Sequence, residues 1–164
     1  MLLPTHAGQL LLAVGVWLIA CRAEKEQPRR LTARDSSAIE AVHAAYVSAW
    51  LEDDTAAVLA TLDSAAVLLP PGHSPVTGHR AIRAFWWPTD GSRTSITAFS
   101  WTMDELAGTP QLAFTRGISD LAWRYEKDTL RSEQSSRNMS LTILAPGADG
   151  RWRILRQMWG PPLR

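Results

Sequence analysis

The 164-residue sequence has a single cysteine, Cys21, so no disulfide can form within the chain. Its 17 lysines and arginines nearly balance 16 acidic residues and form no long run, which argues against a nucleic-acid partner. It contains no glycine-rich phosphate loop and no nucleophile elbow. His73 and His79 lack the further ligands that a zinc site needs. We therefore predict neither a bound metal nor a cofactor.

The sequence also lacks an apolar run long enough to span a bilayer as a helix. Residues 10–20 are apolar and end in Leu18-Ile19-Ala20-Cys21, which resembles a bacterial lipobox. We predict a signal peptide over residues 1–20, lipidation of Cys21 and a membrane anchor in the bacterial cell envelope, on the periplasmic or cell-surface side. Residues 1–9 contain no Lys or Arg, so a secreted protein, or a cytoplasmic one with a mis-set start, remains an alternative.

Residues 21–34 are polar and charged and contain Pro28, which is typical of a flexible, lipid-anchored tether. Residues 35–164 are enough for one domain. Apolar residues make up 46% of the chain, and seven of the eight tryptophans follow residue 49. Such a tryptophan content fits either an aromatic-rich core or an aromatic-lined pocket.

The first part of the domain has helical patterns. Ser37 and Glu40 have the spacing of a capping box and predict a helix after them. Asp54 is expected to cap a second helix over residues 55–62, and a third helix over 78–87 should end at Pro88. A short strand is predicted over residues 65–69. The first helix places six residues on one face: Ile39, Val42, His43, Tyr46, Ala49 and Trp50.

Further along the chain the apolar period changes to two. Strands are predicted over residues 97–103, 112–126, 132–144 and 152–159, as an antiparallel meander. In the second of these strands the apolar phase slips, which predicts a bulge near residues 117–120. Three N-terminal helices packed on a strongly curved, mostly antiparallel sheet give an α+β, cone-shaped fold that encloses a cavity.

Five segments carry a family resemblance by their order and spacing: YVSAW at 46–50, the pair Asp53-Asp54, DSAAV at 63–67, GHRAIRAFW at 78–86 and DGRWRI at 149–154. With them, the domain resembles the nuclear transport factor 2-like superfamily, which includes ketosteroid isomerase, SnoaL-like polyketide cyclases and scytalone dehydratase. Among its members, the SnoaL-like bacterial domains of unknown function are the most similar. The resemblance implies the cone-shaped fold, which hosts many chemistries.

The resemblance also bears on isomerase chemistry. Ketosteroid isomerase uses a carboxylate base together with a Tyr and a protonated Asp that form an oxyanion hole. By resemblance, Tyr46 takes the place of that Tyr, whereas Leu69, just before Pro70, takes the place of the base. Residues 134–148 contain no Asp or Glu to supply the protonated acid. We therefore do not expect isomerisation by that mechanism.

By the resemblance to ketosteroid isomerase, the last strand directs the side chains of Leu155, Gln157 and Trp159 towards the pocket. For the strand before it two phases remain open, one directing Asn138, Ser140 and Thr142 inward and the other Met139, Leu141 and Ile143. Our predicted ligand-binding residues are Tyr46, Trp50, Leu69, Phe85, Trp86, Leu155, Gln157 and Trp159.

These observations favour an extracytoplasmic domain that binds a small apolar molecule. One alternative is an isomerase-, cyclase- or dehydratase-like enzyme that uses Tyr46 with His43, or Arg116 with Asp120. Another is a dimeric association module whose pocket is filled by its own side chains. The family resemblance also implies that the outer face of the sheet forms a homodimer contact.

Overall fold

The computed structural model describes residues 30–162. The predicted signal peptide, Cys21 and most of the predicted tether lie outside the described residues. None of the helices within 30–162 combines the length and the apolar character that crossing a membrane would take. In chain order the elements are α1 Ala33–Leu51, α2 Thr55–Ala60, β1 Leu62–Leu69, β2 Val76–Thr77, α3 Gly78–Trp86, β3 Arg93–Thr109, β4 Leu112–Lys127, β5 Leu130–Pro146 and β6 Trp152–Gly160.

Helix α1 begins earlier than predicted. Thr32 is its N-cap and forms a capping box with Asp35, so the predicted box at Ser37 and Glu40 is wrong. Both pairs have the same spacing, but the helix already begins at Ala33, so Ser37 and Glu40 lie inside α1. The domain therefore includes the last residues of the predicted tether. Asp54 caps α2 as predicted, by accepting a hydrogen bond from the Ala57 amide.

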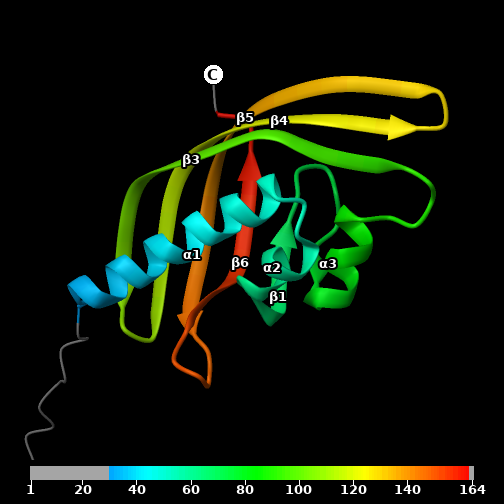
Figure 1. Ribbon diagram of the computed structural model, residues 1–164. Coiled ribbons are helices and arrows are strands. Elements are labelled where there is room, and N and C mark those ends of the chain that lie inside the picture. Colours follow the sequence, from blue (N-terminus) through cyan, green and yellow to red (C-terminus); the bar gives the residue numbers. More distant parts are fainter. Residues whose placement is uncertain (1–29, 163–164) are drawn as a thin grey trace, which may run out of the picture.

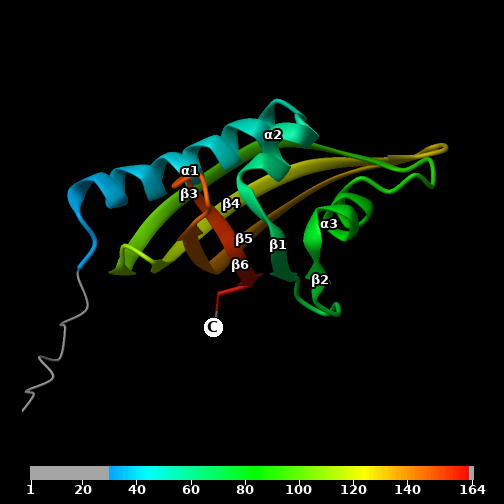
Figure 2. The same ribbon diagram turned by 90° about the horizontal axis from the view of Figure 1, so that it is seen from below.

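The six strands form one curved sheet in the order β2-β1-β6-β5-β4-β3. Strands β3 to β6 are the predicted antiparallel meander, and β1 joins it by pairing parallel to β6. Helix α1 lies across the face towards which the sheet curves, and α3 lies near one end of it (Figures 1 and 2). We call this face concave and the opposite face convex. The α+β, cone-shaped fold predicted from the sequence is confirmed.

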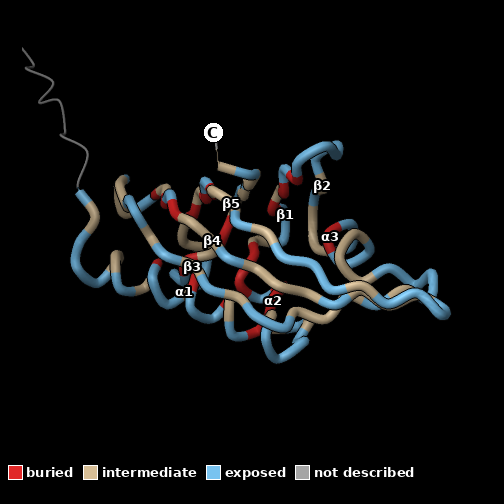
Figure 3. Tube along the Cα trace, turned by 90° about the horizontal axis from the view of Figure 1, so that it is seen from above, coloured by how far each residue is buried: buried red, intermediate tan, exposed pale blue. Residues whose placement is uncertain are grey.

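The core lies where α1, α2 and α3 pack against β1, β6 and the adjoining ends of β4 and β5. Ile39, Leu68 and Ile154 have no exposed surface there. No residue between 118 and 139 is buried, and the tube of Figure 3 is accordingly pale blue and tan along the extended β4–β5 hairpin. The hairpin is therefore held by its strand pairing more than by a core of its own.

The predicted bulge in β4 is wrong. β4 pairs with β5 without interruption from Ala113 to Lys127. The apolar phase slips because the apolar residues change face: Phe114 and Ile118 lie on the convex face, whereas Trp123 lies on the concave face. The irregular pairings with β4 belong to β3 and fall after residues 96 and 103.

Candidate functional site

The upper wall of the site is one face of α1. His43, Tyr46, Val47 and Trp50 follow the spacing of neighbours on a helix face and point towards the concave face of the sheet. His43 and Tyr46 are buried, with 4% and 7% of their surface exposed. The predicted helical face therefore forms part of the site.

The lower wall is the concave face of β3 to β6. Residues that lie directly opposite one another on neighbouring strands share a face. Trp101 of β3 is opposite Ser119 of β4, which is opposite Asn138 of β5. Ser140 of β5 is opposite Trp159 of β6. Of the two open phases for β5, the structure thus selects the one that directs Asn138, Ser140 and Thr142 inward.

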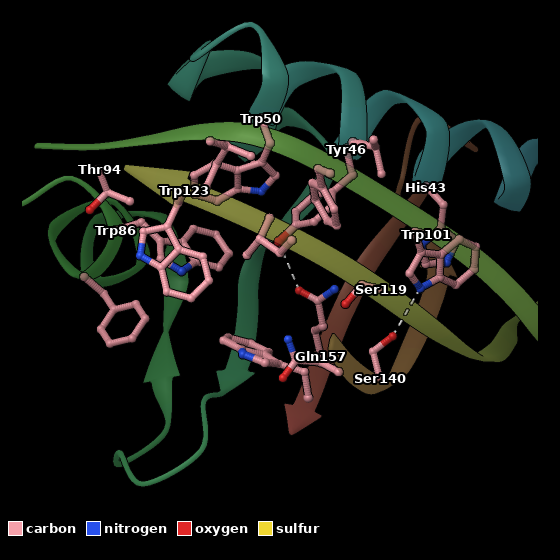
Figure 4. A pocket seen from close by; sticks show the side chains of 17 residues that line it. His43, Tyr46, Trp50, Trp86, Thr94, Trp101, Ser119, Trp123, Ser140 and Gln157 are labelled. Carbon is pink, nitrogen blue, oxygen red and sulfur yellow. Dashed lines mark hydrogen bonds between the residues drawn. The ribbon is translucent and has the colours of Figure 1, made fainter. Parts of the chain in front are cut away.

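These walls enclose a cavity of about 420 Å³, seen from close by in Figure 4. Eight of its 17 lining residues are Trp, Tyr or Phe, and none is Asp, Glu, Lys or Arg. The lining residues are His43, Tyr46, Val47, Trp50, Phe85, Trp86, Thr94, Ile96, Phe99, Trp101, Ser119, Leu121, Trp123, Asn138, Ser140, Gln157 and Trp159.

One end of the cavity is a tryptophan cluster. The ring of Trp50 stacks on that of Trp87 with centroids 4.8 Å apart and meets Trp86 edge-on at 4.9 Å. The ring of Trp86 lies 6.5 Å from that of Trp159. These separations are those of attractive aromatic pairs. The cluster builds a rigid apolar wall and leaves the cavity open.

The other end is organised around His43. Its Nε2 is 2.9 Å from Oγ1 of Thr115, and its ring stacks on Trp101 at 3.8 Å between centroids. Trp101 in turn donates a hydrogen bond from Nε1 to Oγ of Ser140, at 3.2 Å. Burial lowers the pKa of His43 to about 4, so its imidazole is neutral at neutral pH.

Between the two ends, Tyr46 and Gln157 bridge the walls. The Tyr46 hydroxyl donates to Oε1 of Gln157 at 3.3 Å, as the dashed line in Figure 4 marks. Burial raises the pKa of Tyr46, so the hydroxyl stays protonated and acts as a donor. Because Oε1 accepts from Tyr46, the Gln157 amide nitrogen has donors left for a ligand.

The site therefore combines aromatic surface with uncharged hydrogen-bonding groups. Within residues 30–162 no three His, Cys, Asp or Glu side chains gather as metal ligands would. The arrangement can hold an uncharged molecule and orient its polar atoms. His43 and Tyr46 are the titratable groups in its walls, and each is hydrogen-bonded to an uncharged partner.

Most residues predicted for the pocket lie in it. The structure brings together six of the eight: Tyr46, Trp50, Phe85, Trp86, Gln157 and Trp159.

Leu69 and Leu155 do not line the cavity. Leu68 is fully buried on the inner side of β1, so Leu69 lies on the other side, 36% exposed and opposite Met158. Leu155 falls where the β5–β6 register shifts, because Leu144 pairs with Ile154 but Ile143 pairs with Arg156. This one-residue irregularity takes Leu155 out of the alternation that carries Gln157 into the cavity.

Arg116 and Asp120 are not a catalytic pair. Arg116 forms ion pairs with Asp104 at 3.0 Å and Glu105 at 3.2 Å, and Asp120 pairs with Arg137 at 3.0 Å. All of these side chains are well exposed, and neither Arg116 nor Asp120 lines the cavity. The uninterrupted register of β4 places both on the convex face, which the predicted bulge had obscured.

The concave residues of β3 and β4 were not among the predicted pocket residues. Phe99 and Trp101 stand out in the alternation of β3, and Leu121 and Trp123 in that of β4. The apolar alternation of both strands was therefore visible in the sequence. Alternation alone, however, does not say which face of a strand is covered by the helices.

No protein-family model matches the chain, and no curated protein does. Solved structures do match. A ketosteroid isomerase-like protein from Erwinia carotovora atroseptica aligns with a TM-score of 0.64 and 21% identity, over 78% of this chain and 96% of that one. An NTF-2 like protein of unknown function from Shewanella oneidensis aligns with a TM-score of 0.56 and 16% identity, over 76% and 97%.

A protein from Catenulispora acidiphila, in complex with S-DNPA, aligns with a TM-score of 0.53 and 16% identity, over 78% of this chain and 93% of that one. Identities at this level show a shared fold and not a shared activity. The chain has the cone-shaped α+β fold of ketosteroid isomerase-like and NTF2-like proteins.

Proposed function

We propose that this protein binds a small, uncharged and mostly apolar molecule in the cavity under α1. The observation that carries the proposal is the lining: about 420 Å³ of space, walled by aromatic rings and neutral polar groups and by no charged side chain. A charged ligand would lose its hydration there without gaining a counter-charge. An apolar ligand gains stacking surface, and Gln157 offers its polar atoms a hydrogen bond.

The fold comparison supports the same proposal. The similar Catenulispora protein was solved in complex with S-DNPA. The open cavity of this chain favours binding over an association module with a filled pocket, since Trp86 and Trp159 leave the cavity open.

The test is a titration of the full chain with N-phenyl-1-naphthylamine, an uncharged aromatic fluorophore. We expect saturable binding with one site and quenching of tryptophan fluorescence. Ser119→Trp fills the cavity from the floor and should weaken binding at least about tenfold, which corresponds to about 1.4 kcal/mol. Ser100→Trp is the matched control, because Ser100 is exposed and lies on the convex face opposite Asp120.

Two results would contradict the proposal: no saturable binding to the full chain, or equal binding by both tryptophan variants. If the fluorophore binds, a thermal-shift screen of uncharged steroids, polyketides and lipids narrows the ligand, because a ligand that binds the folded chain raises its melting temperature.

A second candidate, an isomerase- or lyase-like enzyme, rests on one observation. His43 and Tyr46 lie about one turn apart on α1, and both reach the cavity. A neutral imidazole can accept a proton, although a pKa of about 4 makes it a weak base at neutral pH. Conversion of a screened ligand that His43→Gln abolishes while binding persists would favour this candidate.

We further propose that the protein is held in the bacterial cell envelope by a lipid on Cys21, which lies outside the described residues. The Leu18-Ile19-Ala20-Cys21 sequence supports the proposal. Metabolic labelling with an alkyne fatty acid should tag the wild-type chain and not Cys21→Ser. Equal labelling of both would contradict it.

A further inference from the structure

A row of uncharged polar side chains runs along the concave face of β5. Asn138 and Ser140 line the cavity, and Ser136 lies opposite Leu121, which lines it too. Since side chains alternate between the faces of a strand, every second residue of β5 lies on this face. We name these residues the polar stripe: Ser132, Gln134, Ser136, Asn138, Ser140 and Thr142.

The polar stripe continues beyond the cavity. β6 pairs with β5 only from Met139 to Pro146, since Pro161 and Pro162, which follow β6, have no N–H to extend the pairing. Figures 1 and 2 show the β4–β5 hairpin reaching well past the end of β6. In this extension Gln134 is exposed and Ser132 is half-buried. These outer polar groups are accessible to a ligand that protrudes from the cavity.

An apolar row accompanies the polar stripe. Leu121, Trp123 and Tyr125 of β4 lie directly opposite its three outer members. Leu121 and Trp123 also line the cavity, so the apolar surface is continuous from the cavity onto the hairpin. A bound molecule would meet aromatic rings on one side and hydroxyl and amide groups on the other.

Apart from Lys127 at its tip, the charges of the hairpin are kept off this face. Three ion pairs connect β4 and β5 on the convex side: Arg124 with Glu133 at 3.0 Å, Asp120 with Arg137 at 3.0 Å and Glu126 with Arg131 at 3.3 Å. Lys127, at the tip, pairs with Asp90 of the loop after α3 at 2.7 Å. From residues 132 to 144 the concave face of β5 carries no charged side chain.

Serine hydroxyls and the amides of Gln and Asn each donate and accept hydrogen bonds. Hydroxyl groups of a ligand do the same, whereas an isolated carbonyl only accepts and an ionised group would remain without a counter-charge. The C–H faces of a sugar ring are apolar and can pack against the aromatic side chains of the adjacent row. The pattern therefore fits a neutral, polyhydroxylated group.

We propose that the outer part of the polar stripe, Ser132, Gln134 and Ser136, binds the uncharged, polyhydroxylated head of an amphiphilic ligand, a glycoside, whose apolar part occupies the cavity. The proposal rests on the proposed function and specifies the ligand class for the same site.

The experiment compares three ligands with the same decyl tail: decyl maltoside and decyl sulfate below their micelle concentrations, and decanol below its solubility limit. Each displaces N-phenyl-1-naphthylamine from the full chain. We expect the maltoside to bind at least about tenfold more tightly than decanol or the sulfate. The double variant Ser132→Ala with Gln134→Ala should weaken maltoside binding about tenfold, the loss expected for two neutral hydrogen bonds. Its affinity for decanol should be unchanged.

The double variant suits the test because Gln134 Nε2 donates to Oγ of Ser132 at 3.4 Å, so both partners of that contact are removed together. Ser135→Ala is the matched control, on the convex face of the same strand, opposite Ala122. Decanol binding without preference for the maltoside would overturn the ligand class and leave the cavity proposal standing. The same would follow if Ser135→Ala equalled the double variant. If no decyl compound or fluorophore binds, the proposed function itself fails.

Discussion

At the scale of single residues, His43 ties the helix, the sheet and the cavity together. Its Nε2 contacts Thr115 on β4, and its ring covers the indole of Trp101 on β3. A protonated imidazole in this position would be a buried charge, and no carboxylate lines the cavity beside it. The burial that keeps His43 neutral therefore makes folding sensitive to acid.

This sensitivity has a defined pH window. The pKa of His43 is about 4 when folded and near 6.5 when unfolded, so the unfolded chain binds more protons between these values. Stability thus rises with pH across the window, and on acidification from pH 6.5 to pH 4 we expect the free energy of unfolding to fall by about 2–3 kcal/mol. Urea unfolding across this range measures it.

His43→Gln is the control, because its amide can still contact Thr115 but does not titrate. The variant should be less stable at pH 7 and should lose most of the fall between pH 6.5 and pH 4. Asp90 and Asp149 affect stability only below this pH window, because ion pairs with Lys127 and Arg153 depress their carboxyl pKa values in the folded chain. A fall of equal size in His43→Gln would refute the assignment to His43.

Single residues also mark where sequence-based prediction stops. Tyr46, Trp50 and Gln157 were assigned to the pocket from helical spacing and from the family resemblance, and they line the cavity. Leu155 was misplaced by the irregular β5–β6 register, which depends on pairing between strands and leaves no mark in local composition. Leu69 was misplaced because the residue before a strand-ending proline was expected to face inward, whereas β1 turns Leu68 inward.

At the scale of elements, β3 lies too close to β4 at Gly117 to admit a side chain there. A Cβ there would lie 2.9 Å from the indole of Trp101 and would also collide with the Thr102 carbonyl oxygen. Glycine therefore lets Trp101 lie against the sheet, where it stacks on His43 and donates to Ser140. The lower wall of the cavity depends on this missing side chain.

Gly117→Ala should accordingly lower the free energy of unfolding by about 1–3 kcal/mol, the usual cost of overpacking. Gly160→Ala, at the end of β6, is the matched control, since nothing lies within 4 Å of its added Cβ. That variant should change stability by less than about 0.5 kcal/mol. Denaturant unfolding of both measures the difference, and equal stabilities would contradict a close approach at Gly117.

The predictions of helices and strands are confirmed where only one face of the element is apolar. The capped α2, the proline-terminated α3 and the meander of β3 to β6 follow from local patterns. β4 was misjudged because its apolar residues change face along the strand, first Phe114 on the convex side and then Trp123 on the concave side. A change of the covered face and a β-bulge both shift the apolar alternation of a strand by one residue, so the sequence alone does not distinguish them.

At the scale of the whole molecule, the two faces of the sheet have different characters. The concave face holds the cavity, whereas the convex face exposes a row of apolar residues. Leu69, Met158 and Leu141 lie opposite one another on β1, β6 and β5, with 36%, 48% and 38% of their surface exposed. An exposed apolar row of this kind suits a twofold contact between identical chains.

We therefore propose that the protein forms a homodimer through this row, with both cavities left open. Met158→Lys places a charge at the centre of the row and should weaken the dimer at least about tenfold, as loss of a central contact does. Met158 is exposed in the single chain, so folding should be unaffected. Light scattering coupled to gel filtration would then report a monomer that still binds N-phenyl-1-naphthylamine.

Leu130→Lys makes the same change at the hairpin tip, where Leu130 is 57% exposed and away from the row, and should remain dimeric. A Met158→Lys protein that stays dimeric would place the contact elsewhere. A wild-type monomer at every concentration would remove the dimer altogether. A monomer that had lost fluorophore binding would mean that the two faces are coupled, because Met158 lies on the convex face and Gln157, beside it in the chain, lines the cavity.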